Sequence, residues 1–163
     1  MTNIKRILLA DDDRDDIDLL CEALNLVDPS IVCEVAKHGE DALNILTSSS
    51  KERPHLIFLD VNMPVLDGWE CLRIIKTYQH LKDIPVVIYS TSSNREDKEK
   101  AFNLGACCFM TKPDRFTVLE RIISVMITTP AGNWSSELNN FKGITFNGSK
   151  IVGYVKIDGK RSR

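Results

Sequence analysis

The chain of 163 residues has no long apolar run, and no stretch approaches the roughly 18 residues that a membrane-spanning helix needs. The N-terminus turns acidic after four apolar residues and lacks the apolar core of a secretory signal. We therefore expect a cytoplasmic protein that makes no contact with a membrane.

Paired metal-binding motifs are also missing. The five cysteines are odd in number, lie in apolar segments and show no C-x-x-C spacing, and the three histidines lie far apart. This distribution indicates neither a disulfide framework nor a zinc site. We expect buried free thiols at Cys21, Cys33, Cys71, Cys107 and Cys108.

Acidic residues outnumber basic residues in most of the chain. Residues 1–127 carry 15 Lys and Arg against 21 Asp and Glu, whereas residues 128–163 carry six against two. Such an acidic body disfavours binding to nucleic acid and suits a cation site. With 43% hydrophobic residues, the length fits one globular domain with an appendage.

Five short apolar runs predict β-strands. They are Ile7–Ala10, Ile31–Ala36, Leu56–Leu59, Val86–Tyr89 and Ala106–Met110. The segments between and after these runs place apolar residues at helical spacing, as in Leu119/Ile122/Met126. Five strands that alternate with five amphipathic helices predict a doubly wound α/β fold, in which helices cover both faces of a parallel sheet.

This regular pattern ends near residue 127. Residues 128–163 hold five of the eight glycines. In residues 151–157, apolar residues alternate loosely with other types, which is typical of a hairpin. About 35 residues cannot enclose a core without metal or disulfides, so we expect no output domain and, by default, disorder. Trp134, Phe141 and Phe146 are unusual in a solvated linker and leave docking on the domain's own surface open.

Polar residues follow four of the predicted strands. They are Asp11-Asp12-Asp13, Asp60-Val61-Asn62, Ser90-Thr91 and Thr111-Lys112-Pro113. The carboxyl ends of parallel strands meet at one edge of the sheet, where ligands bind. Carboxylates gathered there repel unless a divalent cation neutralises them, and oxygen ligands with open water positions favour Mg²⁺.

Phosphoryl transfer suits these groups because it requires mainly positioning and positive charge. Lys112 can pair with an anionic ligand, and the Ser90 hydroxyl can hydrogen-bond a phosphoryl oxygen. Asp60 is the natural acceptor, since it stands alone at the end of the central strand and faces both Lys112 and the acidic pair.

These motifs resemble those of the receiver domains of two-component response regulators. The resemblance covers residues 4–127 and includes the family's spacing, with 30 residues from Asp60 to Ser90 and 52 from Asp60 to Lys112. It implies a flavodoxin-like sheet of five parallel strands in the order 2-1-3-4-5. Residues 128–163 are then a C-terminal extension.

By this resemblance, Asp60 receives the phosphoryl group. Asp11, Asp12, Asp60 and the backbone carbonyl of Asn62 would hold Mg²⁺. The chain would not be an enzyme for an external substrate, because it would catalyse only its own phosphorylation and dephosphorylation.

The resemblance also implies which residues would change conformation when Asp60 is phosphorylated. Ser90 would move to hydrogen-bond the phosphoryl group, Lys112 would pair with that group, and the Phe109 ring would swing inward. Thr91 stands where the family prefers a small residue, which would narrow access to the phosphoryl group. The bond before Pro113 would be cis, as is usual in the family, since an X-Pro bond lowers the cis penalty to roughly 0.5–1 kcal/mol.

Other acidic residues have simpler explanations. Asp13, Asp15 and Asp16 suit a solvated helix N-terminus, where negative charge is favoured. Asp67 and Gly68 suit a turn and a helix cap.

Partners follow from the same resemblance. It implies a sensor histidine kinase or a phosphotransfer protein as donor and a downstream protein as target, with no nucleic acid; a homodimer is left open. The Asp11-Asp12-Asp13 opening, the Ser90-Thr91-Ser92 stretch and the short extension are similar to those of single-domain regulators that accompany bacterial phytochrome kinases.

Two other functions remain open. Asp11-x-Asp13 after an apolar strand also suits a haloacid-dehalogenase phosphatase with Asp11 as nucleophile, although Asp15 stands where that family has Thr or Val. The other is a receiver-like scaffold that is never phosphorylated, although such proteins generally lose an acidic or lysine position.

Overall fold

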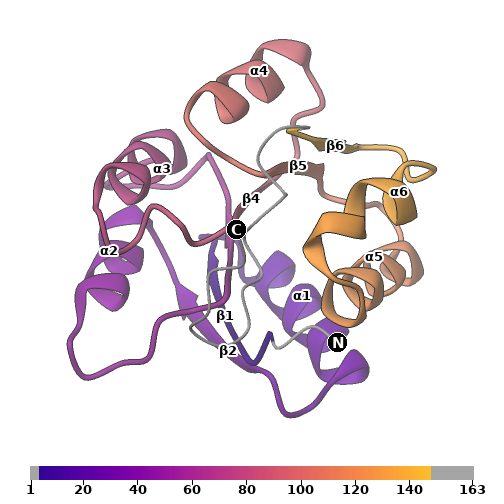
Figure 1. Ribbon diagram of the computed structural model, residues 1–163, viewed down its shortest axis with the longest axis horizontal. Helices are drawn as coiled ribbons and strands as arrows, with labels where there is room; N and C mark the ends of the chain where they lie inside the picture. Colours follow the sequence, from indigo (N-terminus) through magenta and orange to yellow (C-terminus); the bar gives the residue numbers. More distant parts are fainter. Residues whose placement is uncertain (1–3, 148–163) are drawn as a thin grey trace, which may run out of the picture.

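The computed structural model describes residues 4–147, and the predicted hairpin at 151–157 lies outside them. Six strands form a sheet in the order β2-β1-β3-β4-β5-β6 (Figure 1). They are β1 (Arg6–Ala10), β2 (Val32–Ala36), β3 (Leu56–Leu59), β4 (Val86–Ser90), β5 (Cys108–Thr111) and β6 (Ile144–Phe146). The first five are parallel and confirm the predicted order, whereas β6 runs antiparallel to β5.

Helices connect the parallel strands, as the sequence pattern predicts. They are α1 (Arg14–Val27), α2 (Gly39–Thr47), α3 (Gly68–Thr77), α4 (Arg95–Asn103) and α5 (Phe116–Thr128), followed by the 3₁₀ turn η1 (Ala131–Asn133) and by α6 (Trp134–Leu138). Side chains of Asp13, His38, Asp67 and Asn94 accept backbone N–H bonds at the starts of α1 to α4. Among the described helices, none combines the length and apolar character needed to cross a bilayer.

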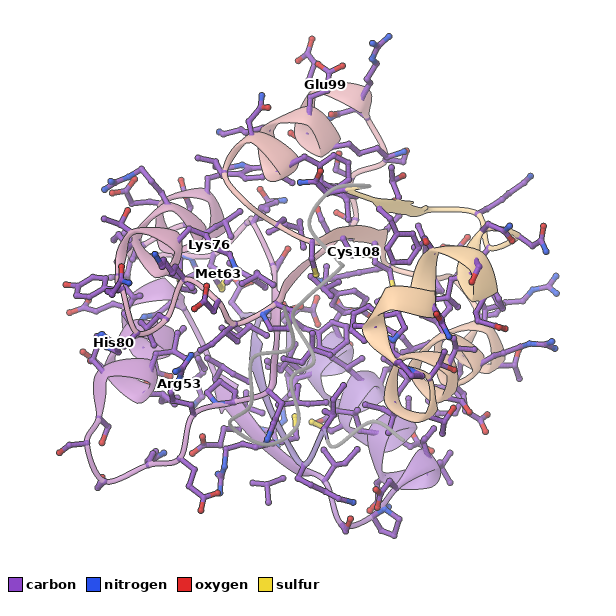
Figure 2. The ribbon with its side chains drawn as sticks, in the orientation of Figure 1. Arg53, Met63, Lys76, His80, Glu99 and Cys108 are labelled. Carbon is purple, nitrogen blue, oxygen red and sulfur yellow. The ribbon has the colours of Figure 1, made fainter. Side chains whose placement is uncertain are left out.

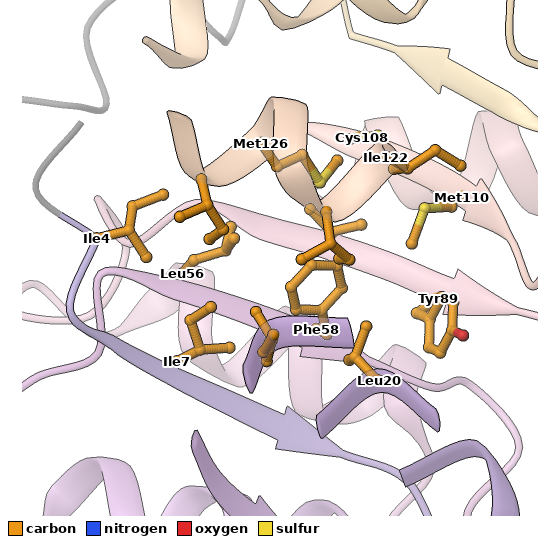
Figure 3. Close-up of a cluster of buried hydrophobic side chains, with 14 of the residues drawn as sticks. Ile4, Ile7, Leu20, Leu56, Phe58, Tyr89, Cys108, Met110, Ile122 and Met126 are labelled. Carbon is orange, nitrogen blue, oxygen red and sulfur yellow. The ribbon is translucent and has the colours of Figure 1, made fainter. Parts of the chain in front are cut away.

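The sheet separates two apolar layers, because successive side chains of a strand point to opposite faces. Ile7, Leu9 and Phe58 pack toward α1, α5 and α6, in the cluster drawn in Figure 3. Leu8 and Ile57 pack toward α2, α3 and α4 on the other side (Figure 1). Coverage on both faces explains why β1 and β3 are almost continuously apolar.

The C-terminal extension docks on the domain, so the default expectation of disorder is wrong for its described part. Trp134 and Leu138 are buried against the cluster that includes α5, and the Trp134 indole N–H donates to the Thr129 carbonyl at 3.0 Å. The Thr111 N–H donates to the Gly143 carbonyl at 2.8 Å, next to β6. Strand β6 therefore pairs with backbone groups that β5 would otherwise expose at the edge of the sheet.

The loop between β3 and α3 is tight. A Cβ atom on Gly68 would lie 2.0 Å from the Asp60 carbonyl oxygen, so only glycine fits there. Val65 has a φ of 67° and is 75% exposed, although a β-branched residue is disfavoured in this left-handed region. This loop shapes the end of β3.

The cysteines divide into two groups. Cys71, Cys107 and Cys108 are buried, and Figure 2 shows Cys108 in the interior and Glu99 on the outer side of α4. Cys21 and Cys33 are only partly buried, so the expectation of five buried thiols is wrong for these two. Cys21 lies on α1. Cys33 lies on β2, an edge strand in which only Ala36 is fully buried.

Candidate functional site

The predicted polar residues gather at the carboxyl edge of the sheet. Asp11 follows β1, Asp60 follows β3, Ser90 ends β4 and Lys112 follows β5. Asp11 and Ser90 have no exposed surface and Asp60 is 5% exposed, and these are the buried polar residues of the described chain. Burial of charged groups is costly unless they are paired or bind a cation.

Three carboxylates converge at this edge. One oxygen from each of Asp11, Asp12 and Asp60 lies within 4.8 Å of the other two, and Asp12 is exposed to solvent. Carboxylate oxygens are the ligands that hard divalent cations prefer. The donor set and its charge therefore suit a divalent metal ion.

The pKa values of the cluster also indicate that Lys112 alone does not neutralise the negative charge of Asp11 and Asp60. Burial raises the pKa of Asp60 to about 6, where the negative charge of Asp11 adds to the effect and Lys112 opposes it. Burial likewise raises the pKa of Asp11, again against the effect of Lys112. A second cation beside Asp60 would relieve the remaining repulsion.

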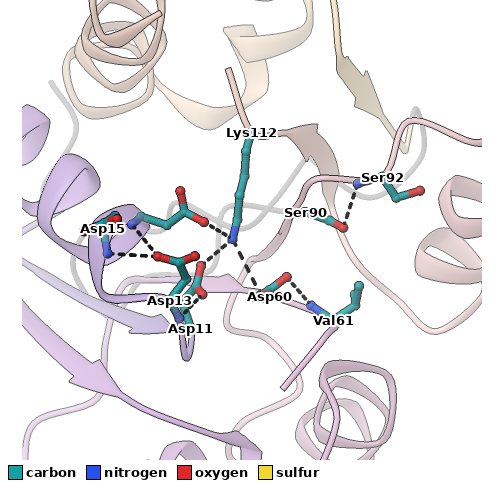
Figure 4. A network of polar contacts seen from close by, with 9 residues as sticks. Asp11, Asp13, Asp15, Asp60, Val61, Ser90, Ser92 and Lys112 are labelled. Atoms are coloured by element: carbon teal, nitrogen blue, oxygen red, sulfur yellow. Dashed lines mark hydrogen bonds and ion pairs between the residues drawn. The ribbon is translucent and has the colours of Figure 1, made fainter. Parts of the chain in front are cut away.

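Lys112 closes the opposite side of the site (Figure 4). Its Nζ donates to Asp11 Oδ2 and to Asp16 Oδ2, both at 2.7 Å, and lies 3.7 Å from Asp60 Oδ2. Burial lowers the pKa of Lys112, but the hydrogen bonds to Asp11 and Asp16 outweigh it and raise that pKa. The ammonium group is therefore a fixed positive charge at neutral pH.

Asp16 is the residue that the sequence interpretation missed. The sequence pattern predicts a solvated helix N-terminal residue, like Asp13 and Asp15, yet Asp16 pairs with Lys112. Asp13 does cap α1, since its Oδ1 accepts the N–H groups of Asp15 and Asp16. The available signal was position: the first turn of α1 begins at the same sheet edge as Asp11.

Local backbone groups hold the two buried carboxylates in place. The Asp13 N–H donates to Asp11 Oδ1 at 2.9 Å, and the Val61 N–H donates to Asp60 Oδ1 at 2.8 Å (Figure 4). The second oxygen of each carboxylate, Oδ2, is the one that faces Lys112. Asp60 therefore presents one oriented oxygen to the site.

The predicted switch residues occupy neighbouring strands. The Ser90 hydroxyl accepts the Ser92 N–H at 3.2 Å, and the Ser90 carbonyl accepts the Lys112 N–H at 2.7 Å. Phe109 has no exposed surface and packs in the apolar layer with Leu8 and Ile57. Thr91 is exposed after β4, and Asn62 is exposed after β3.

The peptide bond before Pro113 differs from the expectation. No cis peptide bond occurs in the described chain, so the Lys112–Pro113 bond is trans and the prediction of a cis bond is wrong. The trans form of an X-Pro bond is the lower in energy by about 0.5–1 kcal/mol. From the trans bond, Lys112 already reaches Asp11 and Asp16.

Comparison with known proteins identifies the family of this chain. The family model described as "Response regulator receiver domain" matches residues 7–124. The response regulator Rcp1 of Synechocystis is 34% identical over 135 residues, which cover 77% of this chain and 90% of Rcp1.

Two solved structures are similar as well. The Mn²⁺-bound form of Rcp1 is 33% identical with a TM-score of 0.71, and the match covers 77% of this chain and 96% of Rcp1. The phosphorylated cyanobacterial phytochrome response regulator RcpA is 34% identical with a TM-score of 0.71, over 82% of this chain and 95% of RcpA. None of these matches supports the haloacid-dehalogenase alternative. The chain belongs to the response regulator receiver family.

Proposed function

We propose that Asp60 accepts a phosphoryl group and that the chain acts as a switch in a phosphorelay. The observation that carries this proposal is the cluster of Asp11, Asp12 and Asp60, whose oxygens lie within 4.8 Å of one another. Lys112 Nζ stands 3.7 Å from Asp60 on the other side. Phosphoryl transfer depends on such positioning and charge.

Asp60 would act through Oδ2. The Val61 N–H holds Oδ1, whereas Oδ2 faces Lys112 and would form the bond to phosphorus while the bond from phosphorus to the donor's imidazole nitrogen breaks. Only the ionised carboxylate is a nucleophile. With a pKa of about 6, Asp60 is mostly ionised at neutral pH even before a cation binds.

The proposed cofactor is Mg²⁺, held by Asp11, Asp12, Asp60 and the backbone carbonyl of Asn62. It would supply positive charge that offsets the phosphoryl oxygens. The cluster fits the ion because it offers few carboxylates and leaves positions for water, as Mg²⁺ prefers. The Mn²⁺-bound form of the relative Rcp1 is consistent with a divalent ion.

Lys112 and Ser90 would respond to the new charge. The Lys112 ammonium, now shared between Asp11 and Asp16, would pair with the phosphoryl group. The Ser90 hydroxyl would leave the Ser92 N–H and donate to a phosphoryl oxygen. Thr91, beside Ser90, would narrow the access of water to the phosphoryl group.

Strand β5 would transmit the movement of Ser90 and Lys112 from the site to β6. Phe109 lies on β5 opposite Thr145 of β6, so a shift of this strand would reach the docked extension. We expect residues 4–127 to be the receiver unit and the message to pass by contact with another protein. The chain would then turn over no external substrate.

The phosphodonor would be a sensor histidine kinase, with a phytochrome as the first candidate, or a phosphotransfer protein. Support comes from RcpA, a phytochrome response regulator at 34% identity. With such a donor, the reaction would take place in the cytoplasm.

Incubation with acetyl phosphate and Mg²⁺ tests the proposal. Intact-mass analysis should show a gain of ~80 Da, which is one phosphoryl group. The gain should disappear in Asp60→Asn and persist in Asp67→Asn, which changes an exposed aspartate on the neighbouring loop. Labelling of Asp60→Asn at the wild-type level, or no labelling of the wild type, would contradict it.

A further inference from the structure

Two cysteines lie side by side away from the site described above. Cys21 on α1 and Cys33 on β2 have their Sγ atoms 3.6 Å apart, at hydrogen-bonding distance for two thiols. Both are partly exposed, whereas the other three cysteines are buried. A small oxidant can therefore reach this pair and not the other thiols.

We propose that Cys21 and Cys33 form a reversible disulfide when the protein meets a hydroperoxide. The two sulfurs need to approach by about 1.5 Å, since an S–S bond is about 2.05 Å long. The pair would be a thiol-oxidation site in a receiver domain, independent of the proposed phosphorylation of Asp60.

The two thiols differ in pKa and would therefore play different roles. The hydrogen bond to Cys33 lowers the pKa of Cys21, against the opposing effects of burial and of the Asp18 charge. The same hydrogen bond, together with burial, raises the pKa of Cys33. Because the thiolate is the nucleophile, Cys21 would react first.

The reaction balances with a hydroperoxide as the oxidant. The Cys21 thiolate attacks one peroxide oxygen, the O–O bond breaks, and Cys21 becomes a sulfenic acid. Cys33 then gives up its proton and its sulfur attacks Cys21 Sγ, where the S–O bond breaks and water leaves. Two thiols have lost two electrons, and hydrogen peroxide has become two molecules of water.

The product would join α1 to the edge strand of the sheet. Helix α1 also carries Asp16, which pairs with Lys112. The disulfide closes a short loop of chain between residues 21 and 33, which restricts the unfolded state and should raise the midpoint of thermal unfolding.

The test uses the full-length reduced protein, treated with hydrogen peroxide in the presence of a chelator. After denaturation, alkylation should find three free thiols and two protected ones, and reduction should restore all five. No Lys or Arg lies between residues 14 and 37, so trypsin leaves both cysteines on one peptide. Cleavage after Glu22 separates them and should yield two fragments joined by a disulfide.

Two variants test the order of the steps. Cys33→Ser should leave a sulfenic acid on Cys21 that dimedone traps, whereas Cys21→Ser should give no adduct at Cys33. Cys71, Cys107 and Cys108 serve as internal controls in each sample. Five free thiols after peroxide treatment, a bridge to a buried cysteine, or equal oxidation of Cys21→Ser would overturn the proposal.

Discussion

Replacing Asp60 by asparagine should stabilise the protein when no metal is present. The Asp60 carboxylate of the wild type is buried and lies beside the negative charge of Asp11. Burial, with a contribution from Asp11, raises the pKa of Asp60 from 3.8 to about 6. Each pKa unit corresponds to about 1.4 kcal/mol, so ionised Asp60 costs about 3 kcal/mol of folding free energy at neutral pH. Asparagine has a similar shape and carries no charge.

The sign of the pH dependence follows from the same shift. Between pH 3.8 and about 6, the folded state binds more protons at Asp60 than the unfolded state, so wild-type stability falls as pH rises through this window. The advantage of Asp60→Asn should therefore be about half as large at pH 5 as above pH 7, where it should reach about 3 kcal/mol.

Urea unfolding, followed by circular dichroism in a chelator at pH 5 to 8, measures this difference. Asp67→Asn is the matched control, since Asp67 is exposed and asparagine caps a helix as well as aspartate does. Added Mg²⁺ should stabilise the wild type more than Asp60→Asn and so narrow the gap. Equal stability of wild type and variant at pH 8, or a gain that does not change with pH, would refute the reasoning.

Three further substitutions have expected outcomes in thermal or urea unfolding. Gly68→Ala should cost about 3 kcal/mol, because the new Cβ would lie 2.0 Å from the Asp60 carbonyl oxygen; an unchanged midpoint would contradict this. Val65→Asn should stabilise by about 1 kcal/mol, since asparagine tolerates a φ of 67° better than valine; a loss of stability would show that no strain is relieved. Leu138→Ala should cost about 3 kcal/mol if the extension unfolds together with the domain, whereas a separate early transition would show that it does not.

Strand order and the position of the site could be predicted from the sequence because both depend on local patterns. Leu56–Leu59 is an apolar run of strand length, and β3 has these same bounds in the structure. Asp60 and Lys112 meet because parallel strands end at one edge, which the alternation of strands and helices already implies.

The remaining features depend on contacts between distant parts of the chain. Asp16 turns toward Lys112, 96 residues away, and its place in the first turn of α1, at the same sheet edge as Asp11, is shared with Asp15. Ile144–Phe146 is too short to predict as a strand and forms one because β5 offers an unpaired edge. The contact between Cys21 and Cys33 likewise depends on how α1 packs beside β2.

The antiparallel strand β6 also changes the surface that this edge of the sheet would present to a binding partner. Within residues 4–147, the outermost strand on this side is Ile144–Phe146 and not the receiver's own β5. Ile144 and Phe146 also pack against the apolar cluster that includes α5, so substitutions there would change both this edge and the packing of the extension. The three residues of β6 lie outside the segments that carry Asp11, Asp60 and Lys112, so the edge of the sheet and the carboxylate cluster can change independently in sequence.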